Sequence, residues 1–267
     1  MTLFRHEMRR AWKSLLIWTA AISGMLALDM LLFPMMKTMA GELDAMLASM
    51  GDDMARAAGL AGMNMLRVGD YYASQISSVL GLGGGIFAAL LGIGALAKEE
   101  RNGTAEFLLT HPLSRSGVVT SKLAAVLLQV LVLNLGAFLL AVLSTLAIGE
   151  VMPWRLYLSL HLAHLLMTTQ IACMCFGLSA LMRRGGVAIA LGLVFLMYFL
   201  SLVAALVGSR QEIAGNVLNA VTPFGYSSGS EILARGGLNP VWTAVGVALT
   251  ACGIALAYLV YRRKDIR

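Results

Sequence analysis

The sequence predicts an all-α, polytopic membrane protein with six transmembrane helices, and three observations support this. Hydrophobic residues make up 59% of the 267 residues and charged residues only 13%, unlike the usual soluble domain. Six stretches are apolar for about 20 residues or more, the length that a helix needs to cross the bilayer core. None of these stretches shows the pattern of barrel strands, in which apolar and polar residues alternate over segments of about ten residues. The backbone groups in lipid must therefore be hydrogen-bonded within helices.

The predicted spans cover residues 15–36, 74–97, 118–148, 156–182, 186–208 and 241–261. The first follows a short amphipathic helix, residues 1–14, in which Phe4, Met8 and Trp12 recur at every fourth position and basic residues occupy the other face. Such a helix is expected to lie in the membrane interface. The first apolar run is longer than the core of a secretory signal and no A-x-A site follows it, so we expect it to be retained.

Two longer segments are predicted on the outer side of the membrane. Residues 37–73 carry methionines at helical spacing between Met39 and Met54, which predicts an amphipathic outer helix. Residues 209–240 are rich in Gly and Ser, carry few charges and are interrupted by Pro223. This composition predicts short outer-leaflet or re-entrant helices packed against protein. One transmembrane domain is expected over residues 1–267, because a chain of this length cannot cover six such helices with a soluble surface. No internal repeat supports an inverted-repeat secondary transporter.

The charge distribution predicts the orientation of the helices. The net charge is +6, and with the N-terminus in the cytoplasm 14 of the 20 Lys and Arg residues lie in cytoplasmic segments. Acidic residues are concentrated in the outer segments. The positive-inside rule therefore places both termini in the cytoplasm. Because orientation accounts for the basic charge, we expect contact with membrane lipid and no nucleic-acid partner.

The cytoplasmic segment between the second and third spans, residues 98–117, has the pattern of a helix, a break and a second helix. Asn102 or Thr104 is suited to cap a short helix, and Pro112 ends it because the residue before a proline avoids helical geometry. Ser114 is then placed to cap the extended third helix. A short helix across the cytoplasmic face is suited to docking a partner; an ordinary loop is the alternative interpretation.

The same segment carries an ordered series of residues: an acidic pair, a Gly-Thr, a Glu, two leucines, a Pro, a Ser-Arg and a later Lys. They are Glu99-Glu100, Gly103-Thr104, Glu106, Leu108-Leu109, Pro112, Ser114-Arg115 and Lys122. A Pro-Phe pair at Pro223 precedes the last span, and the chain ends in a basic segment after Tyr261. In these features, and in its six spans, the chain resembles the permeases of ABC-2-type transporters over essentially its whole length.

The resemblance implies the permease subunit of an ATP-driven exporter in the bacterial inner membrane. Such a subunit pairs with a second permease, identical or related, and with two ATPase subunits. ATP and Mg²⁺ would be bound by the ATPases, so no cofactor is expected on this chain. The short cytoplasmic helix would be the coupling helix, seated in a groove of the ATPase. The residues given this docking role by the resemblance are Glu99, Glu100, Gly103, Thr104, Glu106, Phe107, Leu108, Pro112 and Arg115.

The spacing of the glycines and the absence of a nucleotide-binding motif are consistent with ATP being bound by separate subunits. The chain has no G-x-x-x-x-G-K-[ST] loop to hold ATP phosphates, so it is expected not to be an enzyme. The glycine cluster from Gly81 to Gly85 opens an apolar span and follows no strand. Its spacing favours close helix packing over nucleotide binding.

Three polar residues within the spans are candidates for the translocation path. Asp29 lies in the outer half of the first span, where a charge is costly unless it is paired or hydrated. It either lines the path or reaches water or Lys37. His161 and His164 are one turn apart on the fourth span and either line the path or pack in a polar core. Nearby Met and Cys residues suit soft metals, but they form no compact ligand set, so no metal site is predicted.

Two other functions stay open from the residues alone. One is a secondary transporter or channel that works without an ATPase, with Asp29 as its coupling or selectivity charge. The other is a membrane-bound enzyme that acts on lipid through His161 and His164. Further polar residues in the apolar segments are suited either to hydrogen bonding between helices or to substrate contact: Asn134, Thr168, Thr169, Gln170 and Asn216.

Overall fold

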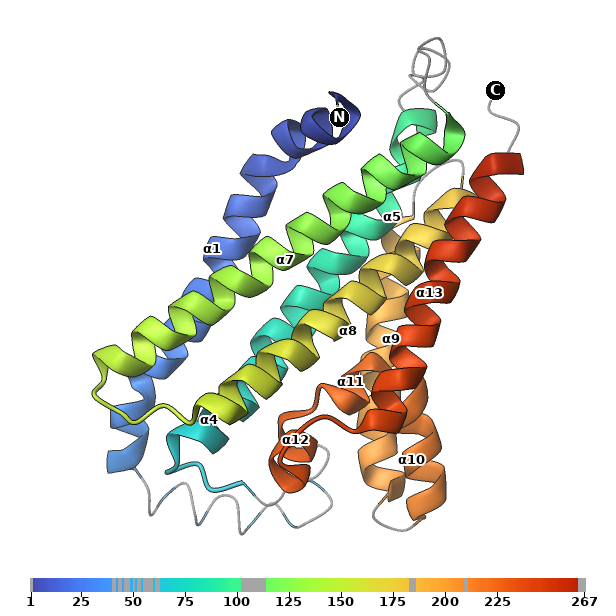
Figure 1. The fold of residues 1–267 in the computed structure, drawn as a ribbon. Coiled ribbons are helices and arrows are strands. Elements are labelled where there is room, and N and C mark those ends of the chain that lie inside the picture. The colour runs from blue at the N-terminus through green and yellow to red at the C-terminus, as the bar shows by residue number, and fades with distance from the viewer. Residues whose placement is uncertain are drawn as a thin grey trace.

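The computed structural model is an all-α bundle in which long helices lie side by side (Figure 1). It describes residues 2–39, 63–101, 114–182, 186–208 and 211–263, together with positions 42, 45, 49, 51, 54 and 60. This described part of the chain contains no strand, and six of its helical segments are long and apolar enough to cross a membrane. The predicted fold class is confirmed.

The spans lie close to their predicted positions. They are formed by α1 (Thr2–Thr38), by α4 (Val68–Ile76) with η1 (Ser77–Gly84) and α5 (Gly85–Arg101), and by α7 (Arg115–Ala147), α8 (Trp154–Leu181), α9 (Val187–Gly208) and α13 (Pro240–Arg263). The second span begins at Val68 and not at residue 74. Tyr71 and Tyr72 are buried there, so packing extends the helix into a segment whose polar residues predicted a loop.

The predicted interfacial helix, residues 1–14, is continuous with the first span. No break separates the two within α1, although the first turns lie at an angle to the rest (Figure 1). Arg9 and Arg10 are exposed, whereas Phe4 and Met8 are partly buried. Trp12, which the sequence places on the apolar face, is 50% exposed, so only part of the predicted apolar face packs against the bundle.

The start of the third long helix has the predicted cap. Ser114 precedes α7, and its side-chain oxygen accepts a hydrogen bond from the Gly117 amide at 3.1 Å. Residues 102–113, which include most of the predicted coupling helix, lie outside the described residues. Most of the predicted outer helix between Met39 and Met54 also lies outside them.

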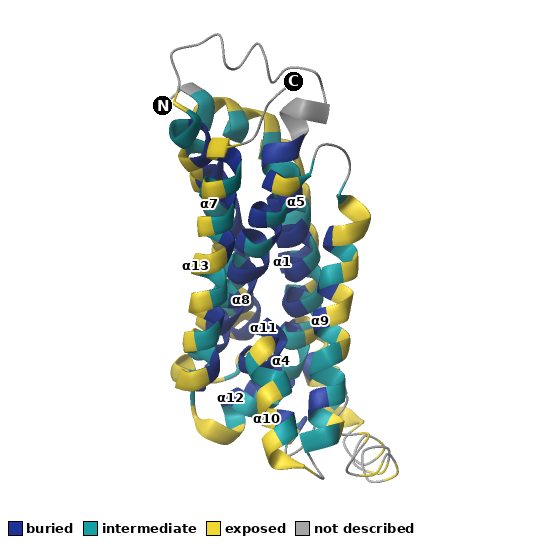
Figure 2. Ribbon diagram, turned by 90° about the vertical axis from the view of Figure 1, so that its right-hand side faces the viewer, coloured by how far each residue is buried: buried dark blue, intermediate teal, exposed yellow. Residues whose placement is uncertain are grey.

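The fourth span, α8, is the central helix of the bundle. It contributes to two buried apolar clusters, one shared with α5, α9 and α13 and the other with α1, α4 and α7. In its most apolar window 67% of α8 is buried, against 17% for α13. Figure 2 shows exposed residues along the outer faces of α9 and α13. These exposed faces are largely apolar and are therefore suited to contact with lipid.

Three short helices connect α9 to α13: α10 (Glu212–Val221), α11 (Pro223–Tyr226) and α12 (Gly229–Arg235). The Thr222 hydroxyl donates to the carbonyl of Met197, halfway along α9, at 2.9 Å. The Tyr226 hydroxyl donates to Gln170 Oε1, in the middle of α8, at 2.7 Å. Because these bonds join α11 to the middle of two long helices, the connecting segment turns back into the bundle.

Candidate functional site

The second span contains an uncommon helical form at its centre. η1 is a π-helix of 8 residues with the sequence Ser-Ser-Val-Leu-Gly-Leu-Gly-Gly. Its amides bond to carbonyls five positions earlier, and Ser and Gly stabilise the competing α-helix poorly. Short π-helical segments occur frequently at functional sites. Polar residues lie near η1 in two groups, one around an open pocket and the other in the interior of the bundle.

The first group lines a pocket of about 400 Å³, which we call the outer pocket. It lies between the second span, α9 and the connecting helices, toward the end of the bundle opposite the termini (Figure 1). Its polar lining includes Ser74, Ser77, Ser78, Glu212, Asn216 and Glu231. Ser77 joins two walls of the pocket, because its Oγ accepts a hydrogen bond from the Gly229 amide at 2.9 Å.

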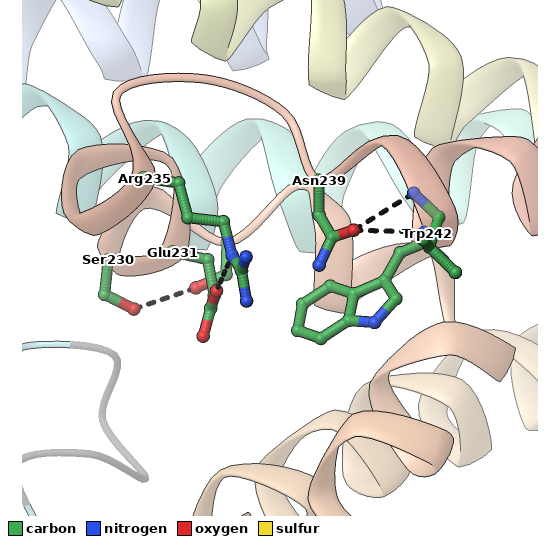
Figure 3. A network of polar contacts seen from close by, with 7 residues as sticks. Ser230, Glu231, Arg235, Asn239 and Trp242 are labelled. Atoms are coloured by element: carbon green, nitrogen blue, oxygen red, sulfur yellow. Dashed lines mark hydrogen bonds and ion pairs between the residues drawn. The ribbon is translucent and has the colours of Figure 1, made fainter.

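A polar network holds the α12 wall of this pocket against the start of α13 (Figure 3). Arg235 Nε donates to Glu231 Oε2 at 3.0 Å, and the guanidinium lies 5.5 Å from the centre of the Trp242 ring. Asn239 Oδ1 accepts hydrogen bonds from the amides of Val241 and Trp242 at 3.1 and 3.4 Å. Arg235 is therefore engaged both by a carboxylate and by an aromatic face.

The second group is a buried cluster around the two predicted histidines. The Tyr72 hydroxyl and His161 Nε2 are 2.6 Å apart, and the Tyr72 ring stacks on Tyr157 with 4.1 Å between centroids. His164 is fully buried, with Nδ1 2.8 Å from the carbonyl oxygen of Leu160. His161 Nδ1 and His164 Nε2 have no hydrogen-bond partner among the described residues. The structure thus buries both histidines of α8. It also gives His161 a hydrogen-bond partner, Tyr72, that the sequence did not predict.

The buried cluster continues along α8 toward the middle of the bundle. Asn134 Nδ2 on α7 donates to Thr168 Oγ1 on α8 at 3.1 Å. Gly84 lies against the same residue: a Cβ at this position would be 3.2 Å from Thr168 Cγ2. For Asn134 and Thr168 the sequence left two roles open, and the structure shows hydrogen bonding between helices.

Asp29 belongs to a different contact, between α1 and α4. Its main-chain carbonyl accepts a hydrogen bond from the Tyr71 hydroxyl at 3.1 Å. Its Oδ2 is buried and has no hydrogen-bond partner in the described part of the chain. Lys37, the partner suggested by the sequence, forms an ion pair with Glu150. Neither pocket described here is lined by Asp29 or the two histidines, and their place on the path stays a prediction.

A second pocket, of about 310 Å³, lies at the end of the bundle that carries both termini; we call it the inner pocket. It is lined by residues of α1, α5, α7 and the start of α9. Lys122 is 1% exposed, and its Nζ donates to Glu7 Oε1 at 3.0 Å and to the Ala95 carbonyl at 2.8 Å. Gln129 Oε1, also buried here, has no partner among the described residues. Lys122 thereby links three helices around the pocket.

Three of the predicted coupling residues fall within the described part of the chain. Glu99 and Glu100 continue the backbone of α5, and Arg115 begins α7. Arg115 Nη1 donates to the carbonyl of Arg262 at 3.1 Å, which joins the start of α7 to the end of α13. The remaining predicted coupling residues lie outside the described residues: Gly103, Thr104, Glu106, Phe107, Leu108 and Pro112. Their docking role stays a prediction.

Sequence reasoning missed most of the outer pocket. Ser74, Ser77 and Ser78 are spaced by three and four positions, which places them on one face of a helix and is the signal that could have revealed them. Glu212 carries no such local signal, because it becomes part of the pocket lining only after the connecting segment turns back. Asn216, which the sequence did single out, lines the pocket.

No group of three or more His, Cys, Asp or Glu side chains in the described residues is arranged to hold a metal ion. Cys173 and Cys175 are buried free thiols. Both thiols pack in the apolar cluster around α8.

Comparison with known protein families agrees with the six-helix architecture. The family model for ABC-2 family transporter proteins matches residues 1–266, and so covers every span and both pockets. No match to a curated protein is found. The match extends over essentially the whole chain, as the resemblance of the cytoplasmic segment implied. The chain therefore belongs to the ABC-2 family of transporter proteins and is a multi-pass membrane protein.

Proposed function

We propose that this protein is the permease subunit of an ATP-driven exporter in the bacterial inner membrane. The observation that supports this most strongly is the family match over residues 1–266 of a chain with six membrane-crossing helices. The sequence has no phosphate-binding loop, so ATP and Mg²⁺ are assigned to separate ATPase subunits. A second permease, identical or related, completes the membrane part of the transporter.

The second span is the element that we propose transmits movement from the ATPase. Its α5 helix runs into the cytoplasmic segment 98–117, to which the docking role is assigned. The same span continues without a break through η1 to α4. Displacement of the cytoplasmic end would therefore be transmitted through η1 to Ser74, Ser77 and Ser78 in the outer pocket.

We place the substrate path between the second span and α9. Both elements contribute to the walls of the inner pocket and of the outer pocket. The inner pocket lies at the end that carries the termini, which the positive-inside rule puts in the cytoplasm, and the outer pocket lies toward the other end. Export would then open the two pockets alternately, as ATP binding shifts the population between two arrangements of the helices.

Co-purification with a candidate ATPase subunit tests the proposal. We expect a stable complex that hydrolyses ATP, and we expect Glu106→Lys or Leu108→Asp to reduce recovery of the ATPase by about tenfold, as loss of about 1.4 kcal/mol of binding energy would. Glu42→Lys makes the same charge change on the predicted outer side and should leave the complex intact.

The competing function gives a different result. Substrate flux that follows an ion gradient, needs no ATPase and disappears in Asp29→Asn would contradict the exporter and support a secondary transporter or channel. Lipid turnover by the isolated chain that is lost in His161→Ala would instead support an enzyme.

A further inference from the structure

The inner pocket has a mainly apolar lining. Leu91 and Ile93 on α5 form part of it, together with Val126 on α7. Its polar side chains, among the described residues that line it, are those of Glu7, Lys122 and Gln129. Its volume of about 310 Å³ is at the small end of the range of about 300–1,000 Å³ for ligand sites, which are mostly apolar with a few polar groups. Size and lining are therefore those of a site for a small apolar molecule.

The two charged residues of the lining compensate each other. Lys122 Nζ donates to Glu7 Oε1 at 3.0 Å, and Lys122 is only 1% exposed. A second hydrogen bond, to the Ala95 carbonyl at 2.8 Å, also holds this ammonium group. A charged ligand would lose its hydration here without meeting an uncompensated opposite charge, which is unfavourable. The pocket is therefore suited to an uncharged molecule.

Gln129 adds an unpaired hydrogen-bond acceptor to this lining. Its Nε2 donates to the Ala125 carbonyl at 3.0 Å, so the other atom of the amide group is the oxygen. This Oε1 is buried, and no described residue donates a hydrogen bond to it. A buried acceptor without a donor is unfavourable, because it has lost its hydrogen bonds to water. A ligand with an O–H group would supply the missing donor.

We propose that the inner pocket binds an uncharged aliphatic molecule with a hydroxyl group, which donates to Gln129 Oε1 while the chain packs against α5 and α7. As the identification of a substrate class this rests on the proposed transport function, whereas binding itself does not. Burial of the aliphatic chain supplies most of the affinity, because transfer of apolar surface out of water is favourable. The hydroxyl group supplies the selectivity, since it alone can pair with Gln129.

The test uses azioctanol, an aliphatic alcohol whose diazirine group attaches to neighbouring residues on illumination, and the methyl ether of the same compound. The two probes share a chain, but only the alcohol can donate a hydrogen bond. Labelling of the full chain in lipid nanodiscs is measured against probe concentration, and the labelled peptides are identified by mass spectrometry. We expect saturable labelling by the alcohol in the peptides of α5 and α7 that line the pocket. Octanol should compete with this labelling, whereas octanoate and octylammonium at the same concentration should not.

Gln129→Met removes the acceptor and keeps a side chain of similar length. The measured quantity is the half-saturating concentration of the ether divided by that of the alcohol. This ratio should be about fivefold lower in Gln129→Met than in the unmodified chain, as the loss of one neutral hydrogen bond would give. The different partitioning of the two probes into lipid is the same for both proteins, and so cancels from the comparison.

Gly94→Phe locates the binding. Gly94 lines the pocket, and a Cβ at this position has nothing within 4 Å, so the added ring has open space to occupy. Gly192→Phe on α9 is the matched control, because a Cβ there also has nothing within 4 Å and the residue lines neither pocket. Saturable labelling by both probes should be lost in Gly94→Phe and retained in Gly192→Phe.

An unchanged ratio in Gln129→Met, or stronger competition by either ion than by octanol, would overturn the proposal. Full labelling of Gly94→Phe, or labelling that never saturates and lies on the exposed faces of α9 and α13, would place the probe elsewhere and overturn it as well. If Gly94→Phe instead converts a dimer to a monomer, the pocket is an interface for a second copy and not a ligand site. Failure of the exporter proposal is seen separately, as an alcohol-binding chain that recruits no ATPase.

Discussion

Lys122 is a charged side chain almost wholly enclosed by helices. Burying an ammonium is strongly unfavourable unless its charge and its donors are satisfied. Here Glu7 supplies the opposite charge at 3.0 Å, and the Ala95 carbonyl accepts a second hydrogen bond at 2.8 Å. Since Glu7 lies on α1, Ala95 on α5 and Lys122 on α7, one side chain fixes the positions of three helices at the predicted cytoplasmic end.

Lys122→Met should therefore destabilise the protein. The variant leaves the Glu7 carboxylate without this partner, and breaking a buried pair costs about 3 kcal/mol. Thermal unfolding in detergent should show a lower Tm, and the double variant Glu7→Gln with Lys122→Met should recover part of the loss. Strictly additive effects of the two substitutions would show that the ion pair contributes no coupling energy.

At the scale of elements, glycines decide how closely α8 approaches its neighbours. A Cβ at Gly92 on α5 would lie 2.2 Å from the Ala172 carbonyl oxygen, and one at Gly177 would lie 2.5 Å from the carbonyl oxygen of Gly253 on α13. Any side chain at these positions would push two backbones apart. In membranes such close approach is a main source of helix association, because lipid contacts compete with apolar packing.

Gly177→Ala tests this packing. The added methyl group collides with the backbone of α13, so we expect a loss of about 1–3 kcal/mol, as for an overpacked core. Gly24→Ala is the matched control, because a Cβ there has nothing within 4 Å and Ala favours a helix. The two variants are compared by thermal unfolding in the same detergent. A Tm of Gly177→Ala equal to that of Gly24→Ala would contradict the close contact between α8 and α13.

At the scale of the whole molecule, the second span connects the two ends of the bundle. Its α5 part contributes to the inner pocket, and α4 with η1 contributes to the outer pocket. The π-helical turns separate these two parts. A change in the number of residues per turn at η1 would rotate Ser74 and Tyr72 relative to α5, and would move the outer pocket and the buried histidine cluster together.

The orientation of the molecule can be tested directly by cysteine labelling. In a background without the native Cys173, Cys175 and Cys252, Glu42→Cys should react with a membrane-impermeant maleimide on intact spheroplasts. Lys13→Cys should react only after the membrane is permeabilised, because the positive-inside rule places it in the cytoplasm. The reverse pattern would put both termini outside and would remove the coupling role from residues 98–117.

Local pattern was sufficient to predict the parts of this protein that depend on the bilayer and on neighbouring residues. The length of six apolar runs predicted the spans, and Ser114 before a helical run predicted the cap of α7, because each depends on residues close together in the chain.

Contacts between distant residues decided the rest. Tyr72 meets His161 and Lys122 meets Glu7 across 89 and 115 positions, and no local pattern distinguishes such partners from other polar residues in apolar runs. The outer pocket exists only because residues 212–235 turn back and form part of its lining together with the serines of the second span. Apolar length is a property of one segment, whereas a buried polar pair or a pocket needs two segments to be placed together by packing.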